Sequence, residues 1–127
     1  MNIKGMSAAV LAGALFAIPA TGHHSHAMFD DTKVLVMEGS VAEFEWTNPH
    51  SWLQVEVANE AGEMVEWSLE MGAPAALARR GWRPRMLSPG DAVSVTIHPL
   101  KDGNPGGALL AVTFPDGTVM GDDEYVN

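Results

Sequence analysis

The chain of 127 residues contains no cysteine. This absence excludes disulfide bonds, thiolate metal sites, cysteine nucleophiles and a lipid-modified cysteine. Positive charge is scarce as well, because 7 Lys and Arg face 16 Asp and Glu, for a formal net charge of −9 at pH 7. Nucleic acids and anionic membrane surfaces are bound through clustered basic residues, so neither is an expected partner.

Hydrophobic runs long enough to span a membrane are also missing. The apolar stretch Met6–Ala20 is shorter than the roughly 20 residues that a spanning helix needs. Lys4 precedes this stretch and small residues end it, which is typical of a secretory signal peptide. The small residues favour cleavage after Gly22 and fit cleavage after Ala20 less well. We therefore expect residues 1–22 to be a signal peptide and the mature protein to be exported to the bacterial periplasm. An uncleaved membrane anchor is the alternative.

Apolar and polar residues alternate with a period of two through most of the remaining chain, which is typical of half-buried β-strands. Pro74–Gly81 breaks this pattern and predicts one short helix, with proline in its first turn and glycine as its cap. Five strands with a helix after the third is the order of the OB-fold barrel. An open sandwich of the same strands is the alternative. The strands are expected over residues 33–46, 51–58, 63–71, 92–100 and 108–114.

This predicted all-β barrel domain covers residues 33–120, between a His-rich segment at 23–32 and an acidic, frayed tail at 121–127. Within the domain, Gly39 predicts a bulge or a sharp bend in the first strand. The Gly- and Pro-rich stretch 101–107 predicts a loop.

Five histidines are the unusual feature of so small and acidic a protein. Removal of the signal peptide would make His23 the first residue, so that its free amine and its imidazole chelate a metal together with His24 or His26. Nitrogen ligands in a tetragonal arrangement favour Cu²⁺. His50 and His98 each adjoin a proline at a predicted strand end, and we expect them to complete the site. The alternative is a polar linker followed by two hydrogen-bonded or surface histidines.

A second interpretation is a non-catalytic interaction module of an envelope or redox complex. Alternation places Trp52 opposite the core face, which makes it the best candidate for an exposed aromatic contact. A basic spot on the acidic chain would complete the docking surface, although pairing with the many carboxylates is the alternative. That spot comprises Arg79, Arg80, Arg83 and Arg85.

Paired carboxylates provide a weaker candidate site. Glu66 and Glu70 share one face of the third predicted strand and could serve acid–base chemistry or bind a hard cation. A solvated strand face is the favoured explanation of both. The sequence lacks the G-x-S-x-G, H-E-x-x-H, Walker and dinucleotide-binding motifs, so we expect no enzyme.

Several short segments of the chain carry a resemblance to known proteins. The most specific is the motif Trp-Thr-Asn-Pro-His-Ser-Trp at 46–52, and the others lie at 23–30, 38–41, 66–70, 80–82, 89–91, 98–99 and 115–117. In these segments the chain resembles a family of small exported bacterial proteins of unknown function, and it is also similar to exported bacterial OB-fold proteins. The resemblance covers nearly the whole mature chain and implies an exported small barrel. It implies no activity, substrate or cofactor. His26 departs from it, because phenylalanine is expected there.

Overall fold

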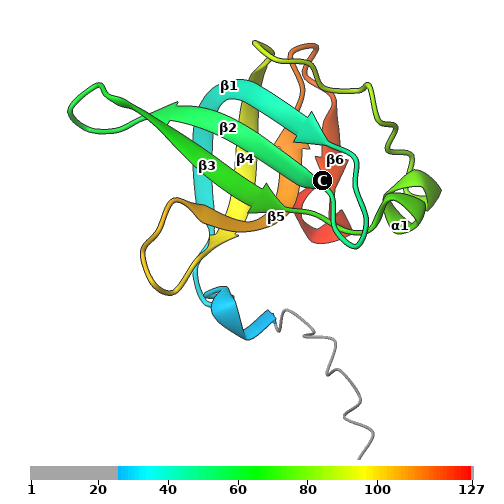
Figure 1. Cartoon of the computed structure of the whole chain (residues 1–127), viewed down its shortest axis with the longest axis horizontal. Coiled ribbons are helices and arrows are strands. Elements are labelled where there is room, and N and C mark those ends of the chain that lie inside the picture. The colour runs from blue at the N-terminus through cyan, green and yellow to red at the C-terminus, as the bar shows by residue number, and fades with distance from the viewer. Residues whose placement is uncertain (1–25, 127) are drawn as a thin grey trace, which may run out of the picture.

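The alternating segments form β-strands that close into a small barrel (Figure 1). The computed structural model describes residues 26–126. The strands are β1 (Leu35–Glu45), β2 (Trp52–Ala58), β3 (Met64–Glu70), β4 (Ala92–Pro99), β5 (Gly106–Thr113) and β6 (Val119–Gly121). One short helix, α1 (Pro74–Arg79), lies between β3 and β4, and the 3₁₀-helices η1 (His26–Met28) and η2 (Asp123–Tyr125) flank the strands.

Five strands make the closed circuit of the barrel. Antiparallel pairs join β3 to β2, β2 to β1, β1 to β4 and β4 to β5. A short parallel pairing of Ser68–Glu70 in β3 with Gly106–Ala108 in β5 closes the circuit. This confirms the small OB-like barrel predicted from the sequence, and the open sandwich is wrong because β3 and β5 pair directly.

Strand β1 serves both halves of the barrel by changing partners along its length. Leu35–Ser40 pairs with β4, and the strand from Ser40 onward pairs with β2. At the change of partner, a Cβ atom on Gly39 would collide with the carbonyl oxygen of Glu56. The register shift itself falls between Val41 and Glu43, so the irregularity predicted at Gly39 lies slightly later in the strand.

The barrel interior is filled by the inward residues of the alternating pattern. Leu53, Val55, Leu69, Val95 and Ile97 are fully buried, as their spacing predicts.

An aromatic group borders this aliphatic core. The ring centroid of Trp82, which is buried, lies 6.2 Å from that of Phe44 and 5.7 Å from that of Phe114. The indole therefore joins the loop after α1 to strand β1 and to the residue that follows β5.

Two sequence-based expectations about the second half of the chain are wrong. Gly106 and Gly107 do not belong to a loop but begin β5, where both are buried. They lie between β3 and β4 at the closure of the barrel, which leaves no room for larger side chains. The frayed tail is likewise wrong for the described residues up to 126. The unexpected strand β6 pairs with β5, and the Asp122 amide donates to the Leu110 carbonyl oxygen at 2.8 Å.

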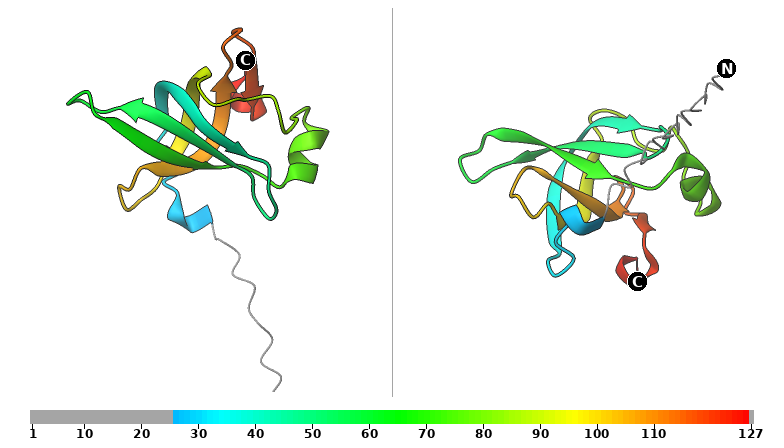
Figure 2. Two further views of the ribbon diagram at one scale, coloured as in Figure 1. Left: turned by 45° about the horizontal axis from the view of Figure 1, so that its top comes forward. Right: turned by 60° about the horizontal axis from the view of Figure 1, so that its bottom comes forward.

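Two further views show how the barrel is extended at opposite ends (Figure 2). The β2–β3 hairpin projects from one end, and α1 lies at the other. Within residues 26–126, no helix combines the length and the apolar character needed to cross a membrane.

Candidate metal and ligand site

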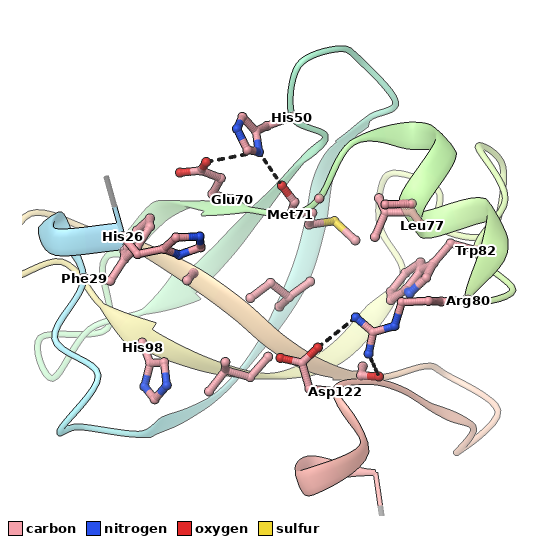
Figure 3. A pocket seen from close by; sticks show the side chains of 16 residues that line it. His26, Phe29, His50, Glu70, Met71, Leu77, Arg80, Trp82, His98 and Asp122 are labelled. Atoms are coloured by element: carbon pink, nitrogen blue, oxygen red, sulfur yellow. Dashed lines mark hydrogen bonds and ion pairs between the residues drawn. The ribbon is translucent and has the colours of Figure 1, made fainter. Parts of the chain in front are cut away.

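A pocket of about 500 Å³ lies beside β5 and draws its walls from distant parts of the chain (Figure 3). Polar side chains come from η1, the β1–β2 loop, the end of β3, the end of α1, the end of β4 and the segment after β6: His26, His50, Glu70, Arg80, His98 and Asp122. Apolar side chains form the remaining surface, among them Phe29, Met71, Leu77, Trp82, Leu109 and Leu110.

His50 is held against the end of β3 by the loop that connects β1 to β2. The amide of Ser51 donates to the Gly72 carbonyl oxygen at 3.0 Å, and the Met71 amide donates to the Ser51 carbonyl oxygen at 2.9 Å. These bonds bring His50 Nδ1 to 3.1 Å from the Met71 carbonyl oxygen and 3.3 Å from Oε1 of Glu70. The loop therefore fixes the position of the imidazole over the pocket.

His98 is held in the same way from the opposite direction. It occupies the penultimate position of β4, and its Nδ1 lies 2.7 Å from the Lys33 carbonyl oxygen. A carbonyl oxygen can only accept, so Nδ1 carries the proton in both His98 and His50. The neutral rings then have their lone pair on Nε2. Histidine ligands of metals are usually held through the other ring nitrogen in this manner.

His26 belongs to the short helix η1, which is fastened to the end of β4. The Phe29 amide donates to the His26 carbonyl oxygen at 3.1 Å, Phe29 forms a bridge with Leu100, and the Asp30 amide donates to the Pro99 carbonyl oxygen at 2.8 Å. As a result, His26 lies between His50 and His98 along one side of the pocket (Figure 3).

The three histidines share the pocket without forming a closed chelate. Among residues 26–126, no three His, Asp or Glu side chains are arranged so that they could hold a metal ion together. His23 and His24 lie outside the described residues. The structure thus places His26, His50 and His98 on the walls of one pocket.

The charged groups of the pocket differ in how well they are compensated. Arg80 Nη1 donates to Asp122 Oδ1 at 2.9 Å, and its Nη2 donates to the Gly121 carbonyl oxygen at 2.7 Å. Glu70 has no such cation, because His50 is its one ion-pair partner within the described part of the chain. Its side chain is only 12% exposed. The pocket therefore contains a shielded carboxylate without a permanent positive partner.

A turn at Asp30 positions the carbonyl group that orients His98. The Thr32 hydroxyl donates to Asp30 Oδ1 at 2.6 Å, and Lys33 Nζ lies 3.2 Å from Asp30 Oδ2. These contacts, the hydrogen bond from Thr32 first, lower the pKa of the Asp30 carboxyl below its usual 3.8. The ionised carboxylate therefore favours the turn whose last residue, Lys33, accepts from His98.

We expect Asp30→Asn to lower the melting temperature at neutral pH and to have little effect well below pH 3.8. A lowered pKa in the folded state contributes stability above the usual pKa, and this contribution is lost as the pH falls through the folded value. Circular dichroism melts at both pH values measure the difference. Asp31→Asn, at the exposed neighbour, is the matched control. A destabilisation that is the same at both pH values would contradict the role of the charge.

The other residues predicted from the sequence differ in their exposure and in their contacts. Trp52 is half-buried, so the expectation of an exposed aromatic is wrong: its strand is flanked by β1 at Glu45 and by β3 at Glu70. Arg80 is paired with Asp122, and Arg83 Nη1 donates to the Trp82 carbonyl oxygen at 2.6 Å.

Arg79 and Arg85 are exposed, and no ion pair is found for either within residues 26–126. The two carboxylates of β3 have separate surroundings. Glu66 is exposed and lies opposite Glu56, whereas Glu70 faces the pocket.

Several pocket residues could not be recognised in the sequence. Leu109, Leu110, Met71 and Trp82 look like ordinary core residues, and Asp122 stands in the stretch that resembles a frayed tail. Only the topology brings them beside the histidines. Among the acidic residues of the pocket, Glu70 could be recognised as a candidate, because alternation places it on the outer face of β3.

Comparison with known proteins gives one match. No curated protein and no solved structure matches the chain significantly. A model of a family of unknown function, DUF6152, matches residues 11–109, a span that includes β1 to β4, the start of β5 and all three histidines of the pocket. Because this match covers most of the chain, the protein belongs to the DUF6152 family of unknown function.

Proposed function

We propose that this protein is an exported, non-catalytic barrel that binds a transition metal, most favourably Cu²⁺, at the histidine side of its pocket. One observation carries the proposal: the Nδ1–H groups of His50 and His98 are both donated to main-chain carbonyl oxygens at the edge of the same pocket. Each ring is thereby fixed in the tautomer that offers Nε2 to a metal.

The remaining ligands would come from the start of the mature chain. His26 lines the pocket, and His23 and His24 stand just before it in the sequence. If the signal peptide is removed after Gly22, the amine and the imidazole of His23 form a chelate with His24, and His50 and His98 complete the coordination. A set of nitrogen donors without thiolates suits Cu²⁺, which heads the affinity order of the divalent ions.

The charge of the molecule supports a cationic ligand. The chain carries a net charge of −9, and the Glu70 carboxylate lies beside His50. A negative potential raises the local concentration of cations and accelerates their capture. Carriage, buffering or delivery of the metal in the periplasm is the corresponding role.

A titration of the mature protein with Cu²⁺ tests this function. We expect the form that begins at His23 to bind one ion with submicromolar affinity, and to bind Zn²⁺ more weakly, as the order of divalent affinities requires. Isothermal calorimetry with a competing chelator measures both. Acidification should weaken binding, because protons compete for Nε2.

A form extended by one methionine before His23 is the matched control. It moves the free amine away from the imidazole of His23 and should bind Cu²⁺ much more weakly. Equal affinity of the two forms would contradict the amine chelate, and absence of Cu²⁺ binding to the mature form would contradict the function as a whole.

A further inference from the structure

We infer that the same pocket has a second ligand class: a small organic cation with an apolar body, such as a primary alkylamine, whose ammonium group pairs with Glu70. This inference does not rest on the proposed metal function. It rests on the uncompensated charge of Glu70 and on the apolar surface beside it.

Shielding the Glu70 carboxylate from water costs free energy. A carboxylate with only 12% of its side chain exposed has lost most of its hydration, and such groups are normally paired with a cation. His50 supplies a single Nδ1–H, which is shared between Glu70 and the Met71 carbonyl oxygen. His50 thus offers one shared N–H to a carboxylate whose other acceptor positions receive no hydrogen bond or cation from the described residues.

The other charges of the pocket do not change this balance. Arg80 is engaged by Asp122 and by the Gly121 carbonyl oxygen, so that ion pair is internally neutral. Figure 3 shows the Arg80–Asp122 pair on the opposite side of the pocket from Glu70 and His50. A ligand that enters between them meets one negative charge, which an ammonium group would neutralise.

The shape and lining of the pocket indicate an organic ligand as well as an ion. Its volume of about 500 Å³ falls in the range of small-molecule sites and is far larger than a metal ion requires. Met71, Leu77, Leu109 and Leu110 provide the apolar surface against which a hydrocarbon chain would lie. An apolar wall with few polar groups is the usual composition of such sites.

The experiment compares hexylamine with hexanol, which differ mainly in the charged group. Metal-free mature protein, dialysed against a chelator, is titrated with each compound by calorimetry. We expect hexylamine to bind, and hexanol to bind at least about 10-fold more weakly, because it cannot supply the missing charge. Glu70→Gln should lower the affinity for hexylamine about 10-fold and leave that for hexanol unchanged.

Glu66→Gln is the matched control, because Glu66 lies on the same strand and is exposed away from the pocket. It should bind hexylamine as the wild type does. Equal binding of the amine and the alcohol, unchanged affinity in Glu70→Gln, or no binding of hexylamine would each overturn the inference. Since no metal is present, these outcomes are separate from the Cu²⁺ titration.

Discussion

Replacing His50 and His98 together by alanine is expected to lower the Cu²⁺ affinity of the mature protein about 100-fold, and each single replacement about 10-fold. Both rings are held through Nδ1 by backbone carbonyl oxygens and both line the pocket. Their Nε2 atoms are therefore oriented before a metal arrives. Loss of such a preorganised nitrogen lowers the metal affinity at least as much as loss of a group that only orients a ligand.

The complementary variant replaces His23 and His24 by alanine and leaves the barrel unchanged. We expect it to lose Cu²⁺ affinity as well, because the proposed site needs both groups of ligands. If the His50/His98 double variant bound Cu²⁺ with wild-type affinity, this would contradict a role of the barrel histidines in Cu²⁺ binding. The amino-terminal chelate would then be the complete site. Melting curves of both variants verify that the proteins are folded.

Replacing Gly107 by alanine is expected to destabilise the barrel by about 3 kcal/mol, the upper end of the cost of overpacking a core. Gly107 pairs with Leu69 in β3 and with Pro99 in β4, so it lies between two strands at the closure of the barrel. A Cβ atom there would collide with the His98 carbonyl oxygen and would approach Ile97 Cδ1 to 2.9 Å. The carbonyl oxygen belongs to the backbone of β4 and cannot move independently of the strand.

Urea unfolding of Gly107→Ala measures this loss. Gly72→Ala is the matched control, because a Cβ at Gly72 would meet only the side chain of Leu77, at an ordinary 3.6 Å. The control should change the free energy of unfolding by less than about 1 kcal/mol. If Gly107→Ala were as stable as Gly72→Ala, β5 would have to tolerate a side chain at the closure of the barrel.

The alternating pattern was sufficient to predict the strand order and the barrel. It worked because one face of each strand is buried, as at Val93, Val95 and Ile97, so that the period of two appears directly in the sequence. It failed at Gly106 and Gly107. Glycine is buried there because neighbouring backbones approach closely, and composition alone cannot distinguish this case from a flexible loop.

The site was predictable only in part, for a related reason. His50 and His98 were recognisable as histidines at predicted strand ends and His26 as part of the His-rich segment, and the structure places all three on one pocket. Their hydrogen-bond acceptors could not be foreseen. The carbonyl groups of Lys33 and Met71 belong to the backbone and leave no trace in residue identity.

The walls of the pocket come from η1, the β1–β2 loop, β3, α1, β4, β5 and the segment after β6. The pocket therefore exists only when the whole barrel is folded. An organic ligand held by these walls therefore binds the folded chain and not the unfolded one. By mass action, a ligand present at 100 times its dissociation constant adds about 2.7 kcal/mol to the free energy of unfolding. A rise in melting temperature therefore ranks amines by their affinity for the pocket without a prior assay of function.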